Sequence, residues 1–285
     1  MNIKTEKDAS ALYDRQGDFM LITRILTAIA GIPVIFACIY FGGLPFYILM
    51  FVVSFFCVQE YLAICAKYKP HTLISLIMSS VFFIALQYCK TDLNIAAAAA
   101  VLMLLILFGA EVSGDNTEQS VGRISVSFLG AFFLPLSLIH MVYIREMKGG
   151  MQLLFFIFII VWVLDTAAYA FGKKFGRHKL AKNISPKKTV EGAAAGMAFG
   201  IIAALACRYI FMSRILTSAQ AFSIGFVIAA VGQFSDLAES LIKRDGNIKD
   251  SGKIVPGHGG VFDRFDSYIF AAPAVYYMLH FIYKF

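Results

Sequence analysis

Acidic side chains cluster near the end of the chain, around a polar, glycine-rich stretch at residues 240–266. Asp236 and Glu239 stand just before this stretch, three residues apart, and Asp263 and Asp266 close it with the same spacing. Residues three apart share one face of a helix, so each pair can project its carboxylates in one direction. Both pairs adjoin hydrophobic segments, where an aspartate without a partner costs about 3 kcal/mol or more. We therefore expect the two pairs to face a common site.

Carboxylate oxygens that converge suit a hard cation, and Mg²⁺ held together with phosphate groups is the usual case. Asp165, towards the end of an earlier hydrophobic segment, can reach the same membrane depth. Structural ion pairs such as Asp263–Arg264 or Glu239–Lys243 are the alternative, but three segments that deliver acids to one face favour a metal. The candidate metal ligands are Asp165, Asp236, Glu239, Asp263 and Asp266.

Glycines and basic side chains between the two acidic pairs suit phosphate groups. Gly257, Gly259 and Gly260 let backbone N–H groups approach phosphate oxygens without obstruction. His258, among these glycines, could donate to a phosphate, transfer a proton or serve a structural role. With the aspartates at 236, 263 and 266, Lys243 and His258 complete the candidate catalytic set. The basic residues available to phosphate groups are Lys243, Arg244, Lys249, Lys253 and Arg264.

A second basic segment, residues 173–189, leads into another hydrophobic stretch. Ser185 followed by Pro186 predicts a helix start, with serine as N-cap and proline at the first helical position. Lys187 and Lys188 would then lie beside exposed N–H groups, which together predict an anion site. A signal for membrane orientation alone would explain the lysines but not their placement at a helix start.

Composition indicates which elements position these residues. Hydrophobic residues make up 59% of the 285 residues, charged residues only 15%, and the mean hydropathy is +0.75, outside the range of a soluble domain. A bilayer-spanning helix needs roughly 20 mostly apolar residues. We therefore predict an all-α polytopic integral membrane protein with about nine transmembrane helices. They are expected at 22–43, 44–66, 72–89, 93–110, 124–144, 151–172, 190–211, 218–242 and 262–284.

The distribution of lysine and arginine predicts the orientation of these helices. With the N-terminus inside, seventeen basic residues fall in cytoplasmic segments and five in outer ones. Because positive charge stays on the cytoplasmic side, we expect a cytoplasmic N-terminus and an outer C-terminus. The net charge of +7 then describes a basic cytoplasmic face suited to lipid headgroups and phosphates. Nucleic acid is a poor fit as a partner, since the sequence contains no soluble basic domain.

Polar residues are unevenly divided along the chain. Residues 1–21 form a polar cytoplasmic tail, and residues 22–148 form a scaffold of five helices with potential lipid or dimer contacts. Residues 149–285 form the expected catalytic region, with basic cytoplasmic loops at 173–189 and 243–261. Glu60, in the scaffold, could face the bundle or lie at the membrane interface. The five cysteines lack C-x-x-C spacing and are expected to pack in the core, while Gly192, Gly196 and Gly200 predict a close-packed helix face.

The motifs together resemble those of phosphatidate cytidylyltransferases, also called CDP-diacylglycerol synthases. The resemblance covers most of residues 22–280, with Ala167, Val190 and Ser235 as departures from the family pattern. Upstream it includes Asp165-Thr166, Ser185-Pro186, Lys188-Thr189, Glu191-Gly192 and Asp236. Its terminal signature is carried by Ser240, Lys243, Arg244, Lys249, Asp250, His258, Gly259, Gly260, Asp263, Arg264 and Asp266.

The resemblance implies transfer of CMP from CTP to phosphatidate at the cytoplasmic face of a bacterial plasma membrane. It implies that Asp236 and Asp263 hold Mg²⁺, with Asp165, Glu239 and Asp266 as further ligands or supporting groups. It also implies a second, monovalent cation such as K⁺, and a homodimer. The residues expected to contact CTP or lipid phosphates are Ser185, Lys187, Lys188, Lys243, Arg244, Lys249, His258, Gly259, Gly260 and Arg264.

Three other functions compete with this interpretation. A CTP-dependent polyprenol or dolichol kinase would phosphorylate an alcohol and would need a base for the hydroxyl group. A CDP-alcohol phosphotransferase would carry a D-G-x-x-A-R element, which this sequence lacks. A cation transporter would distribute its acids across the membrane depth, whereas these acids cluster towards one face.

Overall fold

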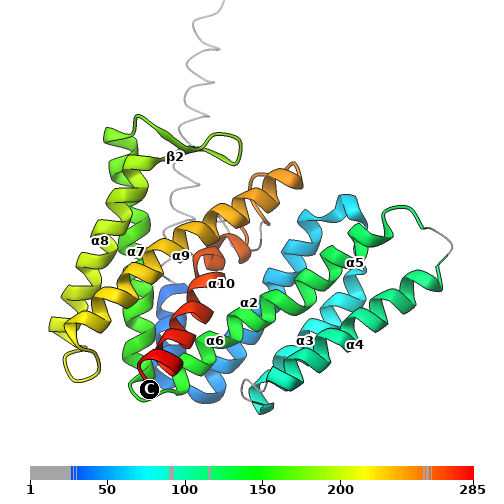
Figure 1. The fold of residues 1–285 in the computed structure, drawn as a ribbon, viewed down its shortest axis with the longest axis horizontal. Helices are drawn as coiled ribbons and strands as arrows, with labels where there is room; N and C mark the ends of the chain where they lie inside the picture. The colour runs from blue at the N-terminus through cyan, green and yellow to red at the C-terminus, as the bar shows by residue number, and fades with distance from the viewer. Residues whose placement is uncertain are drawn as a thin grey trace, which may run out of the picture.

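Helices form nearly all of the computed structural model, which describes residues 27, 29, 31–89, 93–114, 117–252, 254, 257 and 259–285. Within these ranges, nine helical segments follow the predicted ones, with α5 and α6 counted as one continuous segment (Figure 1). The predicted polar tail lies outside the described residues. The helices are Gly31–Phe41, α2 (Gly43–Ile64), α3 (Thr72–Cys89), α4 (Leu93–Val112), α5 (Ser120–Phe128), α6 (Leu134–Glu146), α7 (Gly150–Phe175), α8 (Val190–Ile210), α9 (Ser218–Asp245) and α10 (Phe262–Tyr277), with short turns η1 (Ala66–Tyr68), η2 (Leu129–Phe133) and η3 (Met278–Ile282).

Six of these spans are long and apolar enough to cross a bilayer: α2, α4, the α5–α6 span, α7, α8 and α9. The helix Gly31–Phe41 and α3 are apolar but shorter. The chain is thus an integral membrane protein, and the predicted helical membrane fold is confirmed at this level.

The predicted fifth helix is interrupted by a π-helical turn. The turn η2 joins α5 to α6 without breaking the span Ser120–Glu146. Pro135 follows directly, at the start of α6. Proline has no N–H group and its ring crowds the carbonyl one turn earlier, so a widened turn accommodates it inside a continuous helix.

The predicted helix start at Ser185-Pro186 is wrong. These residues begin strand β2 (Ser185–Thr189), which pairs antiparallel with β1 (Lys179–Ala181) in a two-stranded hairpin. The helix α8 starts only at Val190, where the Thr189 side chain accepts a hydrogen bond from the Gly192 N–H group. Threonine is among the favoured N-cap residues, whereas Ser185 lies within the strand. The lysines at 187 and 188 therefore extend from a strand.

The predicted packing face on α8 is confirmed. Gly192, Gly196 and Gly200 are all buried, and a Cβ on Gly192 would lie 2.6 Å from the Ala168 carbonyl oxygen of α7. A Cβ on Gly196 would lie 3.0 Å from the Leu164 carbonyl oxygen. The absence of side chains thus allows α7 and α8 to approach backbone to backbone.

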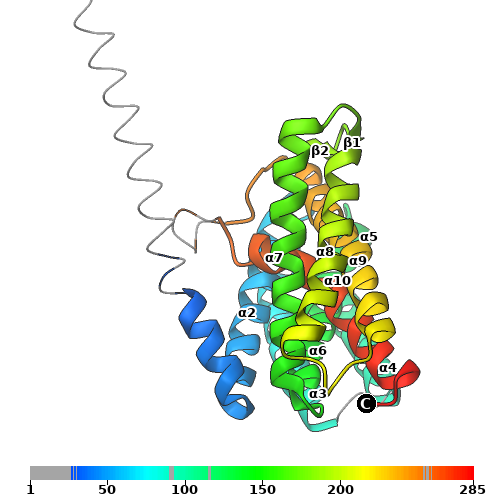
Figure 2. The same cartoon turned by 90° about the vertical axis from the view of Figure 1, so that its left-hand side faces the viewer.

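Two groups of helices form the bundle. The pair α7 and α8 stands side by side, with α9 crossing beside it and α10 next to α9, while α3, α4 and α5 lie on the other side (Figures 1 and 2). Between the two groups, α2 and α6 contact each other and α10. The hairpin and the C-terminal end of α9 lie towards one end of the bundle, and the C-terminus lies at the opposite end (Figure 1). The polar segments of the catalytic half therefore share one end.

We expect Gly192→Ala to destabilise the protein because the new Cβ would be driven into the Ala168 carbonyl. Overpacking of this kind costs about 1–3 kcal/mol. Thermal unfolding in detergent should show a lower Tm than for the unsubstituted protein. Gly200→Ala is the matched control, because its Cβ would meet its nearest atom at an ordinary 3.5 Å; equal Tm values for the two variants would contradict the packing argument.

Candidate metal centre

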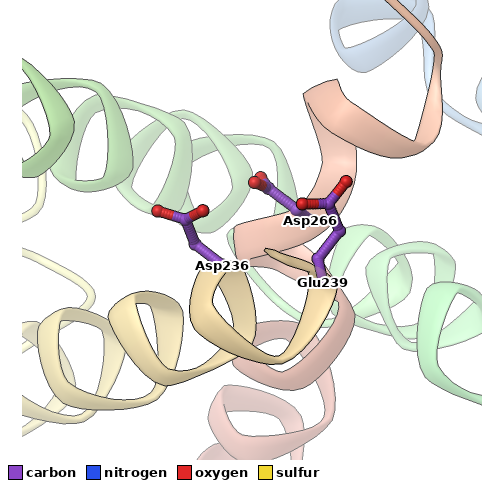
Figure 3. A group of neighbouring side chains, drawn as sticks. All are labelled: Asp236, Glu239 and Asp266. Atoms are coloured by element: carbon purple, nitrogen blue, oxygen red, sulfur yellow. The ribbon is translucent and has the colours of Figure 1, made fainter. Parts of the chain in front are cut away.

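Three carboxylates from two helices share one small space. Asp236 and Glu239 come from α9, and Asp266 comes from α10 (Figure 3). Each offers one oxygen, and these oxygens all lie within 4.8 Å of one another. The spacing of three predicted in each acidic pair places Asp236 and Glu239 together, while α10 brings Asp266 across to them. This cluster is called the acid triad below.

The acid triad fits a divalent cation because its oxygens are poorly satisfied by the protein. Glu239 is only 2% exposed, and neither of its carboxylate oxygens accepts a hydrogen bond. A buried carboxylate that accepts no hydrogen bonds is unfavourable. The Asp266 Oδ1 accepts from the Ser267 N–H at 2.6 Å. Hard cations take such oxygens as ligands, so these three residues could hold Mg²⁺.

Lysines flank the acid triad on both sides. The Lys188 ammonium of β2 forms an ion pair with Asp236. The Lys243 Nζ lies 2.7 Å from Glu239 Oε2 and 2.7 Å from Asp263 Oδ1. Its approach to Glu239 is an ion pair without hydrogen-bond geometry, whereas it donates a hydrogen bond to Asp263. Two lysines thus offset part of the negative charge of four acids.

Asp263 lies outside the acid triad and shares Lys243 with Glu239. Its Oδ2 accepts from the Ser251 N–H at 2.9 Å and from the Gly260 N–H at 3.0 Å, while Oδ1 accepts from Lys243. Both oxygens are therefore occupied, and the carboxylate ties the loop before α10 to α9. The expectation that Asp263 is a principal metal ligand stays a prediction.

A hollow of about 230 Å³ opens beside Asp236. It lies among α7, the hairpin, α8 and α9, with Asp165, Lys188 and Asp236 as its charged groups. Asp165 thus lines the same space as Asp236, although it is not part of the acid triad. Thr189, Gln233 and Tyr169 add polar groups to the wall. The hollow offers an anionic ligand both a lysine and an approach to the acid triad.

A second, apolar cavity of about 240 Å³ lies on the other side of α9. Glu239 forms part of its wall together with Tyr61 of α2, Phe133 of η2 and Phe262 of α10. The acid triad therefore stands between a polar and an apolar space.

Glycines of the predicted phosphate loop are needed for the conformation of the loop and for its contact with Asp263. Gly257 and Gly259 have positive φ values of 75° and 86°, which favour glycine. A Cβ on Gly259 would lie 2.7 Å from Asp263 Oδ2. The Gly260 N–H already donates to that oxygen. The predicted residues His258 and Lys253 lie outside the described residues.

The remaining predicted basic residues are not gathered at the acid triad. Arg244 donates to the backbone carbonyls of Ile184 and Ile248, both at 3.0 Å, and so joins the hairpin to the loop. Lys187, Lys249 and Arg264 are exposed, and Ser185 is half-buried on β2. Their contacts with substrate phosphates stay predictions.

Two residues gain roles that the sequence patterns did not reveal. Ser235, a departure from the family pattern, is buried and donates to the Asp266 carbonyl oxygen, which locks α9 against α10. Glu60 of α2 is also buried, and its carboxylate accepts hydrogen bonds from residues in and after the loop, at positions 251, 261 and 262. Of the two alternatives left open for Glu60, the bundle-facing one is confirmed. The sequence signal for this role of Glu60 is an acidic residue inside an apolar helix.

Buried carboxylates that open onto a lysine-bearing hollow define a membrane-embedded enzyme that handles anionic substrates. Comparison with known proteins identifies the family within this class. The chain belongs to the Cytidylyltransferase family, whose pattern matches residues 22–282.

Curated relatives extend over nearly the whole chain. A phosphatidate cytidylyltransferase of Bacillus subtilis is 32% identical over 272 residues, covering 90% of this chain and 96% of its own length. One of Staphylococcus saprophyticus is 32% identical over 263 residues, covering 90% and 98%. One of Staphylococcus haemolyticus is 30% identical over 269 residues, covering 90% of this chain and 98% of its own length. The family resemblance found in the motifs is thereby confirmed.

We expect Glu239→Gln to weaken divalent-cation binding by about tenfold or more, since it removes one charged oxygen ligand from the acid triad. Binding of Mn²⁺ followed by electron paramagnetic resonance measures this without substrate. Asp245→Asn is the matched control, because Asp245 ends the same helix but pairs with Lys67 at the surface. Unchanged Mn²⁺ affinity in Glu239→Gln would contradict the assignment of Glu239 to the site.

Proposed function

We propose that the chain is a phosphatidate cytidylyltransferase, which converts CTP and phosphatidate to CDP-diacylglycerol and pyrophosphate. The observation that carries this proposal is the acid triad at the edge of a lysine-bearing hollow, in a chain related over 90% of its length to enzymes of that name. The reaction joins a water-soluble nucleotide to a lipid. A polar hollow and an apolar cavity on opposite sides of α9 suit that pair of substrates.

The chemistry requires neutralisation of charge more than proton transfer. A phosphatidate oxygen attacks the α-phosphorus of CTP, a P–O bond forms, and the bond to the β-phosphate oxygen breaks as pyrophosphate leaves. Both substrates are anions, so their electrostatic repulsion raises the activation barrier of the reaction. Lys188 at the hollow and Lys243 behind Glu239 supply positive charge next to the acid triad. The phosphate is already a nucleophile, so no general base is needed.

Mg²⁺ held by Asp236, Glu239 and Asp266 would supply further positive charge for the phosphate oxygens and help to align them. Asp165 and Asp263, also predicted as ligands, lie next to this set and can support it. The second, monovalent cation and the homodimer implied by the family resemblance remain parts of this proposal.

The orientation follows from charge. We place the hairpin and the loop before α10 in the cytoplasm, together with the N-terminus, because basic residues concentrate in these segments. The shared position of the hairpin and the C-terminal end of α9 at one end of the bundle supports this placement (Figure 1). CTP would then reach the hollow directly from the cytoplasm.

Purified protein in detergent with labelled CTP, phosphatidate and Mg²⁺ should form CDP-diacylglycerol and pyrophosphate. We expect Asp236→Asn and Asp263→Asn each to lower the rate by a factor on the order of 10³ or more while the protein remains folded, because each removes a charge at the reaction centre. Chromatography of labelled lipid measures the product.

The same assay separates the competing functions. A polyprenol kinase would release CDP and phosphorylate a polyprenol, and a transporter would consume no CTP. Absence of CDP-diacylglycerol from the unsubstituted protein would reject the proposed activity. Normal turnover in Asp236→Asn would reject the assigned metal centre.

Single cysteines in a background without the five native ones test the orientation. We expect Lys182→Cys, in the hairpin, to react with a membrane-impermeant maleimide only after cells are opened. Arg214→Cys, between α8 and α9, should react in intact spheroplasts, since it lies in the predicted outer loop. The reverse pattern would invert the proposed topology.

A further inference from the structure

Glu60 holds together two segments that lie about 200 residues further along the chain. Its Oε2 accepts from the Ser251 hydroxyl at 2.9 Å and from the Phe262 N–H at 2.8 Å. Its Oε1 accepts from the Val261 N–H at 3.1 Å. The residue is 4% exposed, so these donors stand in for water around a buried charge.

The position of the Glu60 carboxylate at the start of α10 is electrostatically favourable. The N–H groups of Val261 and Phe262 belong to the first turn of that helix, where they have no carbonyl partner within the helix. A negative charge at a helix N-terminus also interacts with the helix dipole. Hydrogen bonds from N–H groups to an ionised carboxylate are among the stronger ones in proteins.

The loop is shaped around this carboxylate. A Cβ on Gly252 would lie 2.5 Å from Glu60 Oε1, and a Cβ on Gly260 would collide with Glu60 Oε2. Both ends of the loop therefore need glycine in order to close around one side chain of α2. This close approach is independent of the hydrogen bonds and points to the same contact.

Glu60 is connected to the acid triad through Ser251 and through the first turn of α10. Ser251 donates its hydroxyl to Glu60 and its N–H to Asp263. The helix turn that Glu60 caps carries Asp263, and the next turn carries Asp266 of the acid triad. Displacement of this turn would shift Asp266 relative to Asp236 on α9.

A neighbouring contact joins the same two parts of the chain. Lys67, just after α2, donates to Asp245 Oδ1 at 2.7 Å, and this bond raises the pKa of the Lys67 ammonium. A Cβ on Gly246 would lie 2.5 Å from the Ile64 carbonyl oxygen. The segment around Lys67 therefore contacts the C-terminal end of α9.

We infer that Glu60 is a positioning residue for cytidylyl transfer: from the N-terminal half, it fixes the loop and the first turn of α10 so that Asp266 meets Asp236 and Glu239. The inference rests on the proposed function. Glu60 is not one of the residues that line the hollow or make up the acid triad. It therefore acts on the reaction through α10 and not by contact with substrate.

Glu60→Gln tests this inference, because it keeps the shape of the side chain and removes its charge. The new amide would turn an NH₂ group towards backbone N–H donors, so the loop should loosen. We expect kcat to fall on the order of 10- to 100-fold, as for a misplaced reacting group. The Mg²⁺ concentration for half-maximal rate should rise, and hydrogen–deuterium exchange should increase in residues 251–262.

Glu111→Gln is the matched control. Glu111 is another carboxylate of the N-terminal half with little side-chain exposure, but its partners are Arg123 and His71, away from the acid triad. We expect this variant to lose comparable thermal stability while keeping the wild-type kcat, Mg²⁺ dependence and exchange in residues 251–262. Ser251→Ala, which removes one of the three donors to Glu60, should show a smaller version of the Glu60→Gln effect.

The outcomes separate this inference from the proposed function. If the unsubstituted protein makes no CDP-diacylglycerol, the proposed function fails. If it does and Glu60→Gln keeps kcat and Mg²⁺ dependence, only the inference fails. A fall in kcat without increased exchange in residues 251–262, or an equal fall in Glu111→Gln, would also overturn it.

Discussion

The cost of keeping several negative charges close together inside a membrane protein governs this structure. Carboxylates repel each other and lose hydration when buried, so each needs a cation or a set of donors. Asp236 pairs with Lys188, and Lys243 bridges Glu239 and Asp263. Glu239 still lacks hydrogen bonds. The compensation supplied by the protein is therefore incomplete, and the divalent cation proposed for this site would offset the remaining negative charge and so let phosphate groups approach.

The two halves of the chain contribute differently to that arrangement. The C-terminal half supplies the acids and the hollow, whereas α2 supplies a carboxylate that organises the loop before α10. The division into an N-terminal scaffold and a C-terminal catalytic region stays a prediction. The hydrogen bonds of Glu60 tie the first of these regions to the second.

Much of the fold was predictable, because a long apolar stretch is a strong signal for a membrane helix. Within lipid, such a helix pairs its own backbone N–H and C=O groups. The acidic pair on α9 was predictable from helical spacing. The hairpin at Lys179–Thr189 was not, since short basic strands have no hydrophobic alternation. Asp263 and Asp266 are three residues apart, but only Asp266 joins the acid triad. The carboxylate of Asp263 accepts hydrogen bonds from loop N–H groups and from Lys243 instead. The role of Glu60 depends on donors far along the chain, which local patterns cannot reveal.

The sequence separation between Glu60 and its donors has a consequence for biogenesis. The Phe262 N–H group lies 202 residues after Glu60, so α2 enters the membrane long before its partner has been synthesised. Throughout that interval this carboxylate needs water or another donor, because an unpartnered charge is unfavourable in lipid. Closure of the loop onto α2 is thus among the final assembly steps, and a nascent chain that stops before α10 has no means of completing the reaction centre.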